Sequence, residues 1–250
     1  MTLTELEMKP RADYADQFYI DDHAALFALL IKQALSLGGK GEETAAKGLI
    51  LYGRERGLRM AMRCLADGNP LTLRNYLNYG EWEDSRKWSD FRPVAFQPFE
   101  MEALACGWCE SWKKHGLLEY GKMYCQWVDP ALVHGFNPEA SFSMGETISR
   151  GGERCRFYFR DATFRDADDF HKDVAERAQA RPRRVRDFLY HAGHGLSAMR
   201  RAYLLELGLL VGTRLTDAAM REYALIFGEE KAGAIRREAE RDFLRIEEPR

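Results

Sequence analysis

The pattern that most constrains the fold is one short run in which apolar and polar side chains alternate strictly. Side chains at every second position of a β-strand point to the same face. The apolar face would consist of Cys155, Phe157 and Phe159, and the polar face of Arg154, Arg156, Tyr158 and Arg160. Upstream, residues 150–153 contain the two adjacent glycines that a tight turn favours. The sequence therefore predicts a β-hairpin near residues 140–160.

Most other periodic segments have apolar residues three and four positions apart, which is the spacing of one helical face. Asp21 or Asp22 is the expected N-cap of the first helix, and Gly208 with Gly212 is expected to mark the turn after the longest. After this first helix, the predicted helices cover residues 42–66, 101–115, 117–135, 166–180 and 185–208. Two shorter helices are expected to follow the last of these, and a short strand is expected around residues 94–96. Helices flanking a small, mainly antiparallel sheet give an α+β fold.

The length of the chain, 250 residues, is near the upper limit for one hydrophobic core. Residues 1–20 are polar and show no clear periodicity. We therefore expect an N-terminal extension over residues 1–21 and a single α+β domain over residues 22–245.

Charge and cysteine usage narrow the class of protein. The 37 Lys and Arg residues nearly balance the 39 Asp and Glu residues, which gives no general attraction to nucleic acid or to an anionic membrane. No apolar run has the length of a signal peptide core or a membrane span. Five cysteines, at positions 64, 106, 109, 125 and 155, form an odd set. We expect a cytoplasmic protein in which they are thiols.

Two glycines, Gly53 and Gly57, lie four residues apart inside the predicted helix over 42–66. Each costs about 1 kcal/mol relative to Ala in a helix interior. Close approach of another backbone is the favoured explanation, and contact with a ligand is the alternative.

Cys106 and Cys109 have the CxxC spacing of a redox motif. No thioredoxin-like βαβ pattern surrounds them, and no second pair of Cys or His residues completes a zinc site. Redox and structural zinc functions are therefore disfavoured.

Cys125 and Asp129 lie four residues apart in a predicted helix, so their side chains share a face. A thiolate is a competent nucleophile, and a carboxylate can accept a proton or orient a partner. The alternative is a buried structural Cys125 and an Asp129 that caps a segment beginning at Pro130.

His191 and His194 lie three residues apart on one face of the predicted long helix, beside Gly193 and Gly195. Glycines beside histidines inside a helix suggest close contact with another group. Two such histidines can bind a metal or supply an acid and a base, although the sequence places no third ligand. In the loop before the sheet, His134 and Asn137 form a polar cluster that could face a cleft.

The run from Cys106 to Phe159 resembles the L-2-amino-thiazoline-4-carboxylic acid hydrolase family. The resemblance extends over roughly residues 22–245, and Gly107 and Glu153 depart from the family pattern, which usually has Pro and Asp there. The matching features are Cys106, Trp108, Gly116, Tyr124-Cys125, Asp129, Gly135-Phe136-Asn137-Pro138, Gly152 and Cys155.

The resemblance implies a hydrolase that opens a small heterocyclic ring at a C–N bond, with a cyclic amidine or lactam such as 2-aminothiazoline-4-carboxylate as substrate. Water would add to the C=N carbon, and the ring would open to N-carbamoyl-cysteine. The chemistry needs a nucleophile or activated water, a proton donor and a cation for the carboxylate. The expected catalytic residues are Cys106, Cys125, Asp129, His191 and His194, and the expected substrate-binding residues are Arg54, Arg56, Arg59, His134 and Asn137.

No cofactor is expected, and the expected partner is a small-molecule substrate, with assembly into a homo-oligomer left open. A second hypothesis comes from another class of protein. The glycine, cysteine and alternating aromatics near residue 155 also resemble non-catalytic small-molecule-binding domains of the 4-vinyl-reductase type. In that case the glycines and aromatics would line a binding cavity and the thiols would be packing residues.

Overall fold

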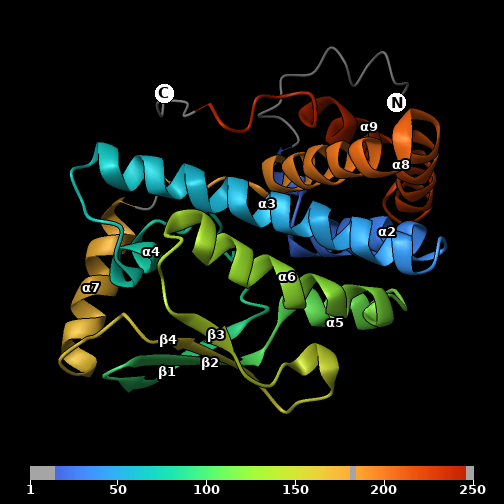
Figure 1. Cartoon of the computed structure of the whole chain (residues 1–250). Helices are drawn as coiled ribbons and strands as arrows, with labels where there is room; N and C mark the ends of the chain where they lie inside the picture. The colour runs from blue at the N-terminus through green and yellow to red at the C-terminus, as the bar shows by residue number, and fades with distance from the viewer. Residues whose placement is uncertain (1–14, 181–183, 246–250) are drawn as a thin grey trace. The chain divides into compact units, whose positions relative to one another are not determined.

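The computed structural model describes residues 15–180 and 184–245, with the side chain of residue 180 left aside, and this part of the chain is mostly helical (Figure 1). Within it are eight α-helices and one four-stranded sheet. The helices are α2 (Ile20–Leu35), α3 (Gly39–Ala66), α4 (Leu73–Asn78), α5 (Gly107–Lys114), α6 (Leu118–Phe136), α7 (Ala167–Ala180), α8 (Phe188–Phe227) and α9 (Glu229–Glu238). The strands are β1 (Asp90–Phe96), β2 (Phe99–Ala105), β3 (Phe142–Met144) and β4 (Cys155–Phe159), and two short 3-10 helices are η2 (Ala15–Gln17) and η3 (Ile148–Arg150).

The chain divides into two compact units. Unit 1 combines Met1–Tyr52, Gly107–Tyr124 and Asp187–Asp242, and unit 2 combines Gly53–Cys106, Cys125–Arg186 and Phe243–Arg250. Unit 1 therefore holds α2, α5, α8 and α9, whereas unit 2 holds the sheet, α4 and α7. The division falls inside α3 and α6, so each of these helices contributes residues to both units. The predicted single domain over residues 22–245 stays a prediction.

The sheet has the strand order β1-β2-β4-β3, and all neighbouring strands are antiparallel. The predicted pairing near residues 140–160 is confirmed, because β3 pairs with β4. Gly151, in the connection between them, has a φ of 87°, a backbone conformation that glycine adopts without a Cβ penalty. Cys155 and Phe159 are buried, as the alternating pattern predicts for the apolar face. The short strand expected around 94–96 is the end of β1.

The helix predicted over residues 101–115 is wrong in its first half. Phe99–Ala105 is strand β2, and helix α5 begins only at Gly107. Phe99 and Ala103 are buried and pair with Phe159 and Cys155 across β4. The alternation of apolar residues with Glu100 and Glu102 is a strand pattern, and it is satisfied because β4 supplies the hydrogen-bonding partner.

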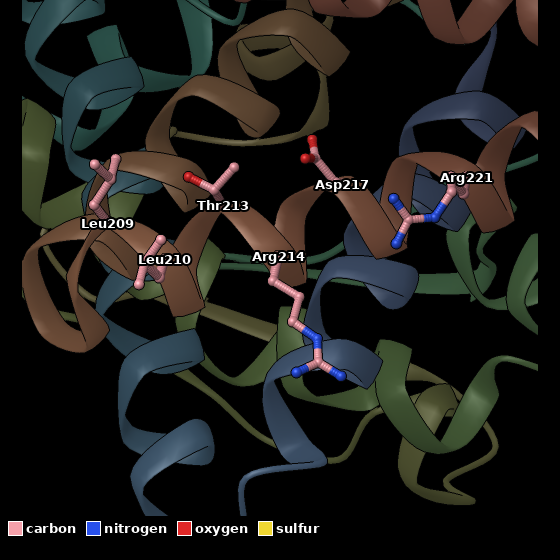
Figure 2. A pocket seen from close by; sticks show the side chains of 6 residues that line it. All are labelled: Leu209, Leu210, Thr213, Arg214, Asp217 and Arg221. Carbon is pink, nitrogen blue, oxygen red and sulfur yellow. The ribbon is translucent and has the colours of Figure 1, made fainter.

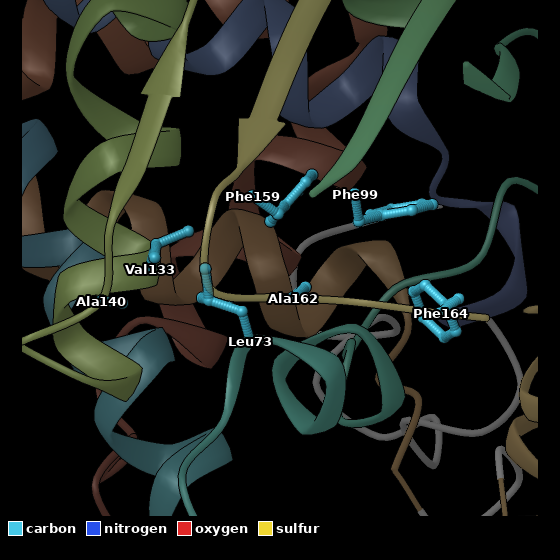
Figure 3. Packing of buried hydrophobic residues seen from close by; sticks show 7 residues of the cluster. All are labelled: Leu73, Phe99, Val133, Ala140, Phe159, Ala162 and Phe164. Atoms are coloured by element: carbon cyan, nitrogen blue, oxygen red, sulfur yellow. The ribbon is translucent and has the colours of Figure 1, made fainter. Parts of the chain in front are cut away.

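Helices pack onto this sheet through a cluster of apolar side chains (Figure 3). The cluster joins Val133 of α6 and Leu73 of α4 to Phe99 and Phe159 of the strands, and Phe170 of α7 packs against it. Phe99 and Phe170 stack with ring centroids 5.3 Å apart. Helices flanking a small antiparallel sheet are the predicted α+β arrangement, which is confirmed in unit 2. The remaining members of the cluster are Ala140, Ala162 and Phe164.

Helices α3 and α6 cross at very close range in unit 2. A Cβ added to Gly53 would lie 2.8 Å from both the Ala131 Cβ and the Val128 carbonyl oxygen. A Cβ on Gly57 would overlap the α6 backbone at Leu132. The two glycines are therefore explained by backbone packing, the favoured sequence interpretation, and this crossing fixes the position of α6 against α3.

The first helix begins at Ile20, two or three residues earlier than an N-cap at Asp21 or Asp22 predicts, and neither aspartate is its N-cap. The cap residue is Tyr19, whose backbone N–H donates to the Asp22 carboxylate at 3.0 Å. Asp22 also accepts from the Tyr223 hydroxyl at 2.7 Å and from the Lys231 ammonium at 2.7 Å. The carboxylate therefore stabilises both the first turn of α2 and its packing on the C-terminal helices.

The predicted turn after the long helix is confirmed at Gly208, where φ is 79° and the helical path of α8 breaks. Gly212 lies just beyond the break. A Cβ there would lie 2.8 Å from the Leu204 nitrogen and the Tyr203 carbonyl carbon. Residues nine positions apart would be far apart in a straight helix, so residues 209–227 fold back toward the end of the preceding segment.

Candidate active site

The predicted pair Cys125 and Asp129 lies on one face of α6, in unit 2. Helix α6 continues through Pro130 to Phe136. Asp129 is therefore an interior residue of a continuous helix, and the alternative in which it caps a new segment is wrong. Both residues are of intermediate burial.

Two further thiols, Cys106 and Cys155, lie near Cys125. Cys106 follows the end of β2, and Cys155 begins β4, opposite Ala103 of β2. Burial raises the pKa of the Cys125 thiol well above its ordinary value, and the neighbouring Cys106, Asp129 and Cys155 raise it further. A hydrogen bond with Ser149 opposes this shift only in part. Cys125 is therefore a neutral thiol near neutral pH, not a thiolate.

Cys155 is also held as a thiol. Burial raises its pKa, and Asp129 adds to the effect, while a hydrogen bond from the Ile148 backbone N–H at 3.4 Å opposes it. The Cys155 side chain is buried on the apolar face of the sheet. This agrees with the predicted position of Cys155 on the apolar face of the strand.

Asp129 has the most distinctive titration behaviour in this cluster. Burial raises the pKa of its carboxyl group from 3.8 to about 6, and the nearby guanidinium of Arg56 limits the rise. Tyr76 of α4 is a further neighbour. Burial raises the pKa of its hydroxyl, and the charge on Asp129 contributes to that rise. A carboxyl group that titrates near neutral pH is suited to general acid–base catalysis.

Behind Asp129 lies a buried cluster of charges that the sequence analysis missed. Glu81 is fully buried and faces three arginines of α3, with oxygen–nitrogen distances of 2.7 Å to Arg59, 2.6 Å to Arg63 and 3.6 Å to Arg56. Burial alone would raise the pKa of Glu81, but the three guanidinium groups hold it well below its usual range. Arg56 therefore lies near the Glu81 carboxylate and also acts on the pKa of Asp129.

A sequence signal for this cluster does exist. Arg56, Arg59 and Arg63 recur at spacings of three and four residues, so they share one face of a helix that also buries apolar side chains. A buried row of arginines requires a buried acidic partner. Glu81 could not be chosen as that partner, because it lies in a segment with no periodicity.

The three predicted substrate-binding arginines have different environments. Arg59 donates to both Glu81 oxygens and, at 2.7 Å, to the Phe243 carbonyl, so its guanidinium is fully used inside the protein. Arg54 is exposed, and its backbone packs against Gly135 of α6. Of the three, only Arg56 lies close enough to Asp129 to affect its pKa.

His134 lies in the last turn of α6 and not in the predicted loop, because α6 continues to Phe136, and Asn137 follows the helix directly. Among the described residues, no hydrogen bond or ion pair joins either side chain to this cluster. His134 is exposed. Asn137 donates to the Leu71 carbonyl at 2.8 Å and accepts from the Glu139 backbone N–H at 3.0 Å. These bonds close the turn that leads from α6 toward β3.

His191 and His194 lie on α8 in unit 1 and are buried. The space beside them is filled by protein. A Cβ on Gly193 would lie 2.6 Å from Cγ of Glu238, and one on Gly195 would lie 2.5 Å from the ring of Phe27. The close contact that these glycines predict is therefore made with α9 and α2.

A third histidine, His23 of α2, lies with them and was missed. Its ring centroid is 6.3 Å from that of His191, and the centroids of Tyr52 and His194 are 4.9 Å apart. The Trp108 indole N–H donates to the His23 Nδ1 at 3.0 Å. An indole nitrogen only donates, so Nδ1 carries no proton, and the protonated Nε2 donates to the Tyr52 hydroxyl at 2.9 Å. This network holds His23 neutral in one tautomer.

In residues 15–180 and 184–245, no group of three or more His, Cys, Asp or Glu side chains is arranged to hold a metal ion. In the same part of the chain, no helix is both long enough and apolar enough to cross a membrane.

Comparison with known proteins yields one match. The family model described as L-2-amino-thiazoline-4-carboxylic acid hydrolase matches residues 19–159. The matched segment runs from the start of α2 to the end of β4 and so contains Arg56, Glu81, Cys125 and Asp129. It ends before His191 and His194. No curated protein and no solved structure matches the chain.

Proposed function

Because the chain belongs to the L-2-amino-thiazoline-4-carboxylic acid hydrolase family, we propose that it hydrolyses a small cyclic amidine that carries a carboxylate, with Asp129 as the acid–base group. The family name implies a hydrolase and a substrate similar to 2-aminothiazoline-4-carboxylate. The observation that carries the proposal is the Asp129 carboxyl group, whose pKa is raised to about 6 beside Arg56.

The reaction on 2-aminothiazoline-4-carboxylate is balanced by one water molecule. Water adds to the amidine carbon, the ring carbon–sulfur bond breaks, and the sulfur takes up a proton. The product, N-carbamoyl-cysteine, keeps both bonds from that carbon to nitrogen. For this ring the bond broken is therefore C–S, whereas a lactam would open at the C–N bond expected from the sequence.

Asp129 has the protonation behaviour that both halves of this reaction need. As a carboxylate it accepts a proton from the attacking water, and as the acid it then returns a proton to the leaving sulfur. A pKa of about 6 leaves both forms accessible near neutral pH, whereas an ordinary aspartate would be a weak acid catalyst there because it is almost entirely ionised. Burial of the side chain supports this role, since it is the cause of the raised pKa.

Arg56 is the proposed cation for the substrate carboxylate. Among the predicted substrate-binding arginines, Arg56 is the one whose charge acts on the Asp129 carboxyl group, so it is the cation nearest to the proposed acid–base group. A carboxylate is attracted by this positive charge, and arginine can bind it with two parallel hydrogen bonds. Binding there would bring the ring carbon of the substrate toward Asp129.

We assign Cys125 to substrate packing and not to nucleophilic attack. The thiolate is the reactive form of cysteine, and burial disfavours that form here. A neutral thiol beside Asp129 provides a polarizable surface for the sulfur of the ring. We propose the same role for Cys106, which adjoins Cys125. Participation of His191 or His194 in the proton transfer is still a prediction. Measuring kcat of the variants His191→Gln and His194→Gln would test it.

The experiment is a turnover assay with 2-aminothiazoline-4-carboxylate, in which mass spectrometry detects the addition of one water molecule. We expect turnover by the wild-type protein and a loss of about 100-fold or more in kcat for Asp129→Asn. Asp168→Asn is the matched control, because Asp168 is an exposed carboxylate of α7 in the same unit. Arg56→Gln should raise KM more for substrates that carry the carboxylate than for the same rings without it.

Two outcomes would contradict the proposal. Undiminished turnover by Asp129→Asn would remove the acid–base assignment. Absence of turnover with every cyclic amidine and lactam, together with a ligand that raises the melting temperature, would favour the non-catalytic binding domain instead.

A further inference from the structure

Tyr76 of α4 is a further polar side chain near Asp129 and Arg56, and the reaction proposed above gives it no role. Its ring packs on two other elements of unit 2. The ring centroid lies 5.7 Å from that of Phe136 in α6 and 6.2 Å from that of Phe159 in β4. These contacts hold the ring, so they also restrict the position of the hydroxyl group at its far end.

The ring of Tyr76 lies about one helical turn from both charged side chains. It packs against a buried cluster that includes Leu132 and Met60. In α6, Leu132 lies three residues after Asp129, and in α3, Met60 lies four residues after Arg56. Residues three or four positions apart share a helical face. The packing of the ring therefore brings the tyrosine to the same faces of α6 and α3 that present the two charges.

The electrostatics agree with this placement. Burial raises the pKa of the Tyr76 hydroxyl, the charge on Asp129 raises it further, and the charge on Arg56 opposes the rise. The hydroxyl is therefore neutral in the pH range around 6 in which Asp129 titrates. A neutral hydroxyl group can both donate and accept hydrogen bonds.

Tyr76 and Asp129 also share an unused capacity for hydrogen bonds. In the described part of the chain, no hydrogen bond is formed by the Tyr76 hydroxyl or by the Asp129 carboxyl group. By contrast, the hydroxyls of three other buried tyrosines each donate to an acceptor in the protein: Tyr79, Tyr203 and Tyr223. Two polar groups that interact through their charges but do not bond directly are suited to being bridged by a small molecule.

We propose that the Tyr76 hydroxyl positions the water molecule that attacks the substrate, which makes Tyr76 a second catalytic residue beside Asp129. This inference rests on the function proposed above. The water donates one hydrogen to the Asp129 carboxylate and the other to the hydroxyl oxygen of Tyr76. A lone pair of the water oxygen is then directed at the amidine carbon, and fixing that orientation lowers the barrier to attack.

Tyr76 itself gains and loses no proton in this step. For an amidine in its protonated form, a carbon–oxygen bond forms as the electron pair of the C=N bond moves onto nitrogen and cancels its positive charge. Asp129 takes one proton from the water. The hydroxyl group that is left on the carbon keeps its hydrogen bond to Tyr76, so the contact is maintained through the addition.

The first test is Tyr76→Phe, which removes the hydroxyl and keeps the ring that packs. With 2-aminothiazoline-4-carboxylate, kcat should fall about 10- to 100-fold while KM stays within about twofold of wild type, because the lost contact is to water and not to substrate. The inflection of kcat/KM near pH 6 should persist at a lower plateau. Tyr158→Phe is the matched control, because Tyr158 lies on the opposite face of β4 from Phe159.

The second test is the double variant Tyr76→Phe with Asp129→Asn. If both side chains act on the same water molecule, its kcat should lie within about threefold of that of Asp129→Asn alone, since the water is no longer activated in either protein. A merely structural effect of Tyr76 would multiply the two losses instead.

An alternative place for a charged small molecule is a groove of about 520 Å³ along α8 (Figure 2). The groove belongs to unit 1, whereas Tyr76 and Asp129 belong to unit 2. Asp217→Asn removes the carboxylate of the groove and should leave both kcat and KM at their wild-type values. The residues that line it are Leu209, Leu210, Thr213, Arg214, Asp217 and Arg221.

The outcomes separate this inference from the proposed function. Undiminished turnover by Asp129→Asn, or no turnover by the wild-type protein, would overturn both. A large loss for Asp129→Asn with Tyr76→Phe within about threefold of wild type would overturn the role of Tyr76 alone. So would a double variant about tenfold or more slower than Asp129→Asn, or a loss in Asp217→Asn as large as that in Tyr76→Phe.

Discussion

Replacing Asp129 by Asn should make the folded protein more stable above neutral pH while removing activity. The carboxyl group of Asp129 has a pKa of about 6 in the folded protein, against an ordinary value of 3.8. The folded protein therefore holds this proton more tightly than the unfolded chain does. Between these two pH values, a rise in pH favours the unfolded chain, because the unfolded chain releases the proton first.

The size of the effect follows from the difference between the two pKa values. One pH unit corresponds to about 1.4 kcal/mol, so a difference of roughly two units corresponds to about 3 kcal/mol. The wild-type free energy of unfolding should lose this amount, from the Asp129 carboxyl group alone, as the pH rises from about 4 to above 6. An asparagine has nearly the same shape as a protonated aspartate and does not titrate, so the Asp129→Asn variant should not show this loss.

The measurement is urea unfolding of both proteins at about pH 4 and about pH 8, since the difference between them removes the contribution of every other titrating group. Relative to wild type, Asp129→Asn should gain about 3 kcal/mol between the two pH values. The exposed control Asp168→Asn should gain nothing. A stability difference between wild type and Asp129→Asn that is the same at both pH values would refute the raised pKa.

Three further predictions test the surroundings of the site. Glu81→Gln should lower the free energy of unfolding by about 3–5 kcal/mol in urea titrations, because three buried guanidinium groups would lose their carboxylate partner. A loss below about 1 kcal/mol would contradict the stabilising role of this charge cluster. Gly57→Ala should lower the free energy of unfolding by about 1–3 kcal/mol in thermal melts, because the added Cβ would overlap the α6 backbone. The control Gly39→Ala has open space at its Cβ, so it should be neutral or stabilising in the same melts. Cys125→Ala should keep kcat within about tenfold of wild type, and a loss as large as that of Asp129→Asn would instead make Cys125 a nucleophile.

Elements with strong local patterns could be predicted from the sequence. Strand β4 follows from the alternation around Phe157, and the helices α3, α6 and α7 follow from helical spacing. Strand β2 could not be separated from helix α5, because β2 becomes a strand only through its pairing with β4, a partner more than fifty residues away. Local periodicity does not contain that information.

Only part of the candidate site could be predicted from the sequence, and the reason is the same. Cys125 and Asp129 could be paired because four residues of one helix set their positions. Glu81 and Tyr76 could not be added, since their positions depend on the packing of α4 and the following loop against α3. The glycines beside His191 and His194 predicted close contacts correctly, but spacing cannot distinguish a ligand from Phe27 or Glu238.

The central claim is that Asp129 is the acid–base group of a hydrolase. Its most direct test is the pH dependence of kcat/KM for 2-aminothiazoline-4-carboxylate in the wild-type protein, which reports the pKa of essential groups in the free enzyme. We predict an inflection at about pH 6, the pKa of Asp129. A measurable kcat/KM with no inflection near this pH would contradict the claim.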